Sequence, residues 1–332
     1  MAPRSALLLG RSGDRGKKHH PRGNREDAVS RLRCPRAVAV LAYVAPIERA
    51  NLVIDLISNW QTETAGAEDA RLLGSAAVVV GAFDLAMPFL SAAVAGLRAQ
   101  GRLGQLARAL TMLGWGALCQ ADWQVAIPAL DEAFGMATET GEAAWAAGAR
   151  AMQAIIAALR GEPAVAAALS VEAEGVAISV GATHMLAYIH VARGLAALGD
   201  GRATDAYDEF VHMYHVDDPA HHVVPACWYV GELAEAAAHG AHRETARALI
   251  QELELLIEGS RSPWIRSAFT YAHIQLADDA HFEQRVGKAL SPDHASRWPF
   301  HRARLQFAYG SWQLASATTS CCGSKTSAAI SP

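Results

Sequence analysis

The amino-acid sequence repeats itself every forty residues, and this period limits the fold more than any other feature. Small residues return at this step, and six alanines lie exactly forty residues apart: Ala77, Ala117, Ala157, Ala197, Ala237 and Ala277. Nine residues further along, a second column runs from Ala86 to Val286 and is otherwise alanine. A fixed period of this length is typical of repeat proteins, in which each unit is one supersecondary element.

Each repeat contains two apolar-periodic segments around a short polar break, and Gly101, Gly141 and Gly181 end the second segment as C-cap glycines do. The composition, 52% hydrophobic and rich in alanine, favours helix. A single helix hairpin cannot bury its apolar face, whereas stacked hairpins share one core. The sequence therefore predicts an all-α fold, an α-solenoid of about six tetratricopeptide-like hairpins with an extended concave surface. The alternative, an Ala-rich helical bundle, has no need of strict register.

The ends of the chain do not follow the repeat. Residues 1–36 carry ten Lys/Arg against three Asp/Glu and lack periodicity, so we expect a disordered basic arm. Residues 37–67 are transitional and predict one or two helices, and residues 68–312 form the predicted repeat domain. Residues 313–332 contain only Leu314 and Ile330 as large apolar residues, so we expect the helix to stop at Trp312 and a disordered tail to follow.

Charge and cysteine usage exclude several classes of protein. The net charge of −4 includes the basic arm, so the rest of the chain is acidic and unsuited to direct DNA binding. The five cysteines form neither a disulfide framework nor a CxxC pair, which predicts a reducing, cytoplasmic location. No apolar run reaches 18 residues, so we expect no membrane association.

One segment, HMYHVDDPAHH over residues 212–222, gathers possible metal ligands. His212, His215 and His222 are weak candidates, because a loop with many potential ligands does not fix a coordination geometry. Our prediction is therefore no metal. Aromatic residues near the helix pairs pack between repeats or line a ligand or peptide groove. As candidate groove residues we select Trp123, Asp218, His222, Trp228 and Tyr229.

Motifs for catalysis are missing from the sequence. It contains no GxSxG, no HExxH and no Cys–His pair at nucleophile spacing. Gly10 and Gly16 are separated by five residues, and Lys17 is followed by another lysine, so this stretch departs from the Walker pattern. We predict no catalytic residues, no cofactor and no enzymatic activity.

Several segments resemble the helical-repeat region of large ATP-binding LuxR-type transcriptional regulators. They include VVVGAFDLAMPFLSAAVAGLRAQGRLGQLARAL, SPWIRSAFTYAHIQLADD and RWPFHRARLQFAYGSW, and the resemblance covers about residues 68–312. In that family an ATPase module precedes the repeats and a helix-turn-helix domain follows them. The resemblance implies a repeat region that senses an inducer or protein partner. We expect this chain to lack both flanking modules.

Three functional interpretations remain open. The first is a sensory and scaffold segment of a LuxR-type regulator that binds a protein partner or a small-molecule inducer. The second is an autonomous tetratricopeptide-like adaptor that binds a peptide. The third is a non-functional fragment, since the text from Gln313 onward looks like a shifted reading frame. Its unpaired C-terminal repeat would then expose apolar surface and promote self-association.

Overall fold

The computed structural model describes residues 34–291 and 298–326, and within these ranges the chain is helical and contains no strand. This confirms the predicted all-α class. In chain order the elements are α2 (Pro35–Val44), α3 (Ala50–Ser58), the 3₁₀ turn η1 (Thr62–Thr64), α4 (Ala67–Val79), α5 (Phe83–Ala99), α6 (Leu103–Cys119), α7 (Trp123–Glu139), α8 (Ala143–Leu159), α9 (Pro163–Ser179), η2 (Thr183–Met185), α10 (Leu186–Gly199), α11 (Ala203–Val211), α12 (Val223–Trp228), α13 (Val230–His239), α14 (Arg243–Leu256), α15 (Pro263–Gln275), α16 (Asp279–Ala289) and α18 (Pro299–Thr326).

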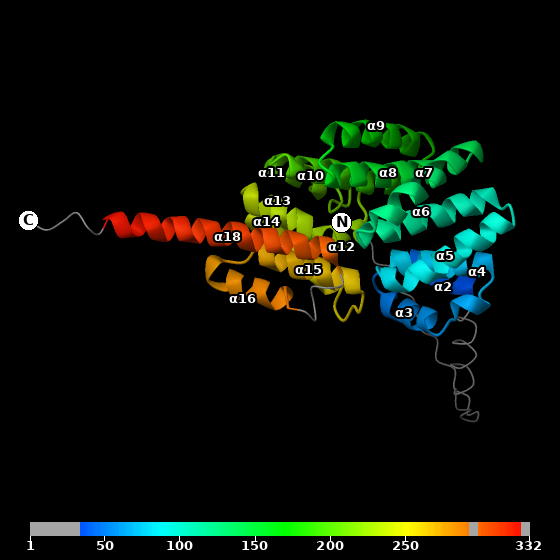
Figure 1. The fold of residues 1–332 in the computed structure, drawn as a ribbon, viewed down its shortest axis with the longest axis horizontal. Helices are drawn as coiled ribbons and strands as arrows, with labels where there is room; N and C mark the ends of the chain where they lie inside the picture. Colours follow the sequence, from blue (N-terminus) through cyan, green and yellow to red (C-terminus); the bar gives the residue numbers. More distant parts are fainter. Residues whose placement is uncertain (1–33, 292–297, 327–332) are drawn as a thin grey trace, which may run out of the picture.

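Consecutive helices pack as antiparallel hairpins that follow one another along a curved stack (Figure 1). The described residues contain six such pairs, which confirms the predicted solenoid: α4–α5, α6–α7, α8–α9, α10–α11, α13–α14 and α15–α16. The forty-residue step is exact over five of them, because their second helices begin at Phe83, Trp123, Pro163, Ala203 and Arg243.

The same turn joins the two helices of each of these five hairpins. In α8–α9, Gly161 has a φ of +73°, and the amide of Glu162 donates to the carbonyl of Ala157 over 2.9 Å. This is the Schellman arrangement that ends helices at a left-handed residue. The acceptor in every such turn belongs to the first alanine column, from Ala77 to Ala237, at 2.9 to 3.0 Å. The register of the column therefore fixes where each first helix ends.

The two helices of a hairpin touch where a small residue faces a large one. A Cβ built on Gly114 would lie 2.5 Å from Cγ of Leu130, and the same holds for Gly74 with Leu90 at 2.6 Å. In the third hairpin the two positions hold Ala154 and Ser170 instead, and both are fully buried. In this hairpin the first column gains a methyl group and the second holds a smaller side chain. The spacing between the helices is thus set by complementary volumes at close packing.

The start of the hairpin stack contacts the loop between its fifth and sixth hairpins directly. The side chain of Asn51 in α3 donates to the carbonyl of Gly259 over 2.9 Å and accepts the amide of Arg261 over 2.7 Å. Arg261 also pairs with Asp55 over 2.6 Å. Helices α2 and α3, which precede the first hairpin, are here called the N-terminal cap. The contacts of Asn51 and Asp55 connect this cap to the loop between α14 and α15, so the solenoid curves back onto its own start.

The predicted boundaries need two corrections. Residues 1–33 lie outside the described residues, but Pro35 already starts α2, so the predicted arm is too long by at least two residues. The predicted end of helix at Trp312 is wrong, because α18 continues to Thr326 and only residues 327–332 of the predicted tail lie outside the described ranges. No Pro interrupts the segment from Gln313 to Thr326, and Leu314 is its only large apolar residue, so the helix continues there without an apolar stripe.

The line of contact where a small residue of one helix faces a large residue of the other, here called the seam, predicts an energetic coupling between Gly114 and Leu130. We expect Gly114→Ala to lower the free energy of unfolding by about 1–3 kcal/mol, because the new methyl group overlaps Leu130. Leu130→Ala alone costs about 2–5 kcal/mol through the cavity it leaves. The double variant should cost less than the sum, as measured by urea unfolding. Gly135→Ala is the matched control, since no atom lies within 4 Å of its Cβ position. Strict additivity would contradict the seam.

Two of the turns place alanine where the others have glycine. Ala121 and Ala241 have φ values of +58° and +62°, in the left-handed region that costs an L-residue roughly 1–2 kcal/mol. We expect Ala121→Gly and Ala241→Gly each to raise the free energy of unfolding by about 0.5–1 kcal/mol, after allowance for the greater freedom of glycine in the unfolded chain. Thermal unfolding tests this. At Ala65, where φ is −78°, the same change should be destabilising instead.

Candidate functional site

Aromatic rings from distant hairpins meet on the inner face of the solenoid. Phe83 lies edge-on to Trp228 and to Trp264, with ring centroids 5.3 Å apart in both pairs. Trp115 contacts Trp228 at 5.2 Å and Tyr188 at 4.7 Å. Such aromatic pairs are favourable beyond the area they bury. Around these rings the inner face is therefore a packed core. The extended open concave surface expected from the sequence is filled by side chains in this part of the solenoid.

Beside this cluster the inner face leaves a cavity of about 340 Å³, within the range of small-molecule sites. Its walls come from α4, α6, α8 and α10, the inner helices of four successive hairpins, together with the cap helix α2 and the start of α12. The lining residues are Tyr43, Pro46, Val79, Thr111, Met112, Trp115, Ala144, Trp145, Gly148, Met152, His184, Met185, Tyr188, His222 and Val224.

The lining follows the forty-residue repeat, a signal that the sequence contains and that our sequence analysis did not use. Equivalent positions of successive repeats face the same space, and in three of four such sets the side chains differ from one repeat to the next. The equivalent sets are Met112 with Met152, Trp145 with Met185, Gly148 with Tyr188, and Ala144 with His184 and Val224. Three of these four sets vary in size, whereas the column from Gly74 to Ala234, where the two helices of a hairpin touch, contains only glycine and alanine.

His222 lines the cavity, and its hydrogen bonding and protonation follow from the structure. Its Nδ1 accepts the backbone amide of Val224 over 3.3 Å and so caps α12. Burial lowers the pKa of His222 to about 4, and the nearby charges of His184 and His221 act in the same direction. The ring is therefore neutral at pH 7, with its proton on Nε2. Among the described residues no acceptor bonds to this N–H.

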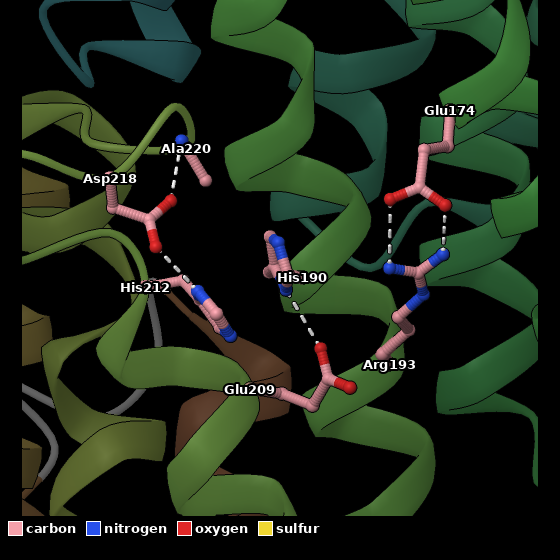
Figure 2. A network of polar contacts seen from close by, with 7 residues as sticks. All are labelled: Glu174, His190, Arg193, Glu209, His212, Asp218 and Ala220. Atoms are coloured by element: carbon pink, nitrogen blue, oxygen red, sulfur yellow. Dashed lines mark hydrogen bonds and ion pairs between the residues drawn. The ribbon is translucent and has the colours of Figure 1, made fainter.

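A network of polar contacts holds the loop that carries His222 (Figure 2). His212 Nδ1 lies 2.7 Å from a carboxylate oxygen of Asp218, and the other oxygen accepts the amide of Ala220 over 2.7 Å. The ring of His212 stacks on His190 with centroids 4.1 Å apart, and His190 bonds to Glu209 over 2.8 Å. Although burial opposes ionisation, the bonds from His212 and Ala220 hold the pKa of Asp218 below its usual range.

This network explains the histidine-rich segment without a metal. His212 is bonded to Asp218, His215 is exposed and His222 lines the cavity, so the three weak candidates do not converge. Among the described residues, no group of three or more His, Cys, Asp or Glu side chains is placed to hold a metal ion. The loop is ordered by carboxylate–imidazole bonds instead.

The five candidate groove residues are distributed over three places. His222 lines the cavity, and Asp218 supports its loop. Trp228 is fully buried against Trp115, behind the cavity wall. Trp123 and Tyr229 instead border a much smaller cavity of about 30 Å³, which has room for about one water molecule. The set therefore does not form one open groove.

A buried group of charges, which the sequence analysis did not identify, lies beside the smaller cavity. Arg304 of α18 pairs with Glu232, over 3.3 Å, and with Glu235 of α13. The hydroxyl of Tyr271 in α15 donates to Glu235 over 2.8 Å. Burial raises the pKa of Glu232, and the charge of Arg304 opposes the shift. Three helices far apart in the sequence thus share one ionic contact, and removing one partner would leave a buried charge unpaired.

Comparison with known families and proteins adds no relative: no family model and no curated protein matches this chain. The resemblance to LuxR-type regulators therefore rests on the quoted segments alone. Among the described residues, every helix is too short or too polar to cross a membrane.

Buried His301 of α18 predicts an acid-sensitive stability. Its Nδ1 lies 2.9 Å from the hydroxyl of Ser267, and burial lowers the pKa of His301 to about 3, with a smaller contribution from Arg304. The unfolded chain takes up this proton near pH 6.5, so stability is lost progressively as the pH falls from 6.5 to about 3. At pH 5 the loss from this residue should be about 2 kcal/mol.

Urea unfolding at pH 7 and pH 5 checks this expectation. His301→Phe removes the titrating group, so its loss of stability between the two values should be about 2 kcal/mol smaller than that of the unmodified chain. His221→Phe, at an exposed position, is the control and should keep the full loss. An equal pH dependence in all three proteins would contradict the assignment.

Proposed function

We propose that this chain is the sensory helical-repeat segment of a LuxR-type transcriptional regulator, and that it binds a small-molecule inducer in the cavity of its inner face. The observation that carries the proposal is the 340 Å³ cavity, whose walls come from four successive hairpins and the N-terminal cap. A ligand there would contact α4, α6, α8 and α10 at once. Binding would then stabilise the relative positions of the repeats, which is how a sensor couples a ligand to a conformational state.

A small molecule suits this inner face better than a peptide. Peptide grooves of helical repeats are open along the stack, whereas here Phe83, Trp228 and Trp264 fill the inner face next to the cavity. The remaining space is short and mainly apolar, with a few polar groups, as is usual for small-molecule sites. A protein partner would use another surface.

Thermal unfolding of the purified chain against a library of small metabolites tests the binding. We expect at least one compound to stabilise the chain by about 2.7 kcal/mol at a hundredfold excess over its dissociation constant. Ala144→Trp, which adds a large side chain at the exposed mouth of the cavity, should remove the effect. Ala168→Trp on the exposed face of α9 is the matched control and should keep it. A stabilisation that survives Ala144→Trp would place the ligand elsewhere.

The regulatory part of the proposal needs a second measurement. Light scattering after size-exclusion chromatography, with and without the stabilising compound, should show a change in molecular mass or hydrodynamic radius. If neither the molecular mass nor the hydrodynamic radius changes at a saturating concentration of the compound, the sensory role is contradicted. The chain would then be a repeat protein that binds a ligand without responding to it.

A further inference from the structure

The chemistry of the cavity limits the ligand further, and this step rests on the proposed function. The residues that line the cavity include no Lys, Arg, Asp or Glu. A carboxylate, phosphate or ammonium group would lose its hydration there and gain no opposite charge, which is costly in an apolar environment. The cavity therefore favours a molecule without net charge.

Molecules rich in hydroxyl groups are also disfavoured. The hydroxyl of Thr111 already donates to the carbonyl of Ala107 over 2.9 Å, and His184 and Tyr43 lie at the exposed mouth. The inner polar groups that remain include His222, the hydroxyl of Tyr188 and the indole N–H of Trp115, and neither Tyr188 nor the Trp115 indole makes a hydrogen bond to a described residue. A polyol would bury several hydroxyls with no partner, at a cost of about 1–3 kcal/mol for each.

The apolar walls suit a flat aromatic ring system. Trp115, Trp145 and Tyr188 provide ring surfaces, and three methionines complete the lining: Met112, Met152 and Met185. Methionine adapts its shape to a ligand and makes favourable sulfur–aromatic contacts. The volume of 340 Å³ equals about eleven water molecules at about 30 Å³ each, so it holds a molecule of about ten non-hydrogen atoms.

The loop before α12 supplies one fixed hydrogen-bond donor that can orient such a molecule. His222 Nδ1 is occupied by the amide of Val224, and the backbone of His222 donates to the carbonyl of Met213 over 3.2 Å, so the ring is fixed and its Nε2–H has no acceptor among the described residues. We infer that the cavity binds a neutral, bicyclic aromatic molecule that accepts a hydrogen bond from His222 Nε2–H. Quinoline is a minimal probe, since it has ten non-hydrogen atoms and one ring nitrogen as acceptor.

Four probes of defined chemistry test the inference by isothermal titration calorimetry at pH 7.5. Quinoline should bind most tightly, and naphthalene, which has the same shape without an acceptor, about 3- to 10-fold more weakly, the ratio expected for one neutral hydrogen bond. The anion 2-naphthoate and glucose should bind at least a hundredfold more weakly than quinoline. Ala144→Trp should abolish quinoline binding, and Met185→Trp, on another wall, serves as a second variant that fills the cavity.

Substitutions at His222 and His221 separate the contribution of the hydrogen bond to affinity from the contribution of the cavity's shape. His222→Ala should reduce quinoline affinity to that of naphthalene and leave naphthalene unchanged, whereas His222→Gln, which keeps an N–H donor near the same position, should restore part of the difference. His221→Ala, at the exposed neighbouring position, is the control and should bind quinoline normally.

The possible failures are distinguishable. Binding of glucose or 2-naphthoate that is lost in Ala144→Trp would overturn the ligand class and keep the cavity as a binding site. Equal affinities for quinoline and naphthalene would overturn the role of His222. If none of the four probes binds at millimolar concentration while the metabolite library gives a compound that depends on the cavity, the ligand class is wrong and the proposed function stands. If neither the four probes nor any compound of the metabolite library binds in the cavity, both the ligand class and the proposed function are overturned.

Discussion

The close approach of the two helices in each hairpin is the constraint on which the rest of this structure depends. At Gly114 the partner side chain of Leu130 occupies the space where a Cβ would lie, and the same geometry returns at Gly74 and at Gly194, opposite Phe210. Because packed interiors tolerate neither overlap nor voids, the volumes on the two sides must remain complementary. The pair Ala154 and Ser170 shows this best, since a larger residue on one side accompanies a smaller one on the other.

This seam, together with the Schellman turns, fixes the pitch of the stack and so determines which residues face inward. The carbonyl of each alanine in the first column closes the turn, and the next helix begins at a constant distance along the chain. Equivalent positions of the inner helices then point at the same central space. A cavity built from Met112, Met152 and Tyr188 is a consequence of that register, because these residues lie 40 and 36 positions apart in the sequence and only the stacking of the hairpins brings them together.

The repeat and the hairpins could be predicted from the sequence because they depend on local signals: alanine and glycine columns, polar breaks and C-cap glycines. The filling of the inner face could not, because it depends on the curvature of the whole stack, which brings Phe83 to Trp264. The histidine-rich segment, residues 212–222, shows where prediction from local signals stops and the fold of the whole stack decides. Its density made His222 a candidate, but only the fold separates His222, which faces the cavity, from His212, which fixes the loop through Asp218. The helical continuation beyond Trp312 is not predictable from apolar periodicity, because Leu314 is the only large apolar residue between Gln313 and Thr326.

Within the part of the stack that surrounds the cavity, the outer helix of one hairpin is interrupted, and the cavity acquires its inner imidazole there. Helix α11 has nine residues, whereas α5, α7 and α9 have seventeen each, and the chain between Val211 and Val223 forms a loop that leads to His222 instead of completing the outer helix. Such an interruption gives up helix hydrogen bonds and apolar packing, and here carboxylate–imidazole pairs and the stack of His190 on His212 replace them. Local departures from a consistent pattern concentrate at functional sites, and the orientation of His222 toward the cavity is what this departure produces.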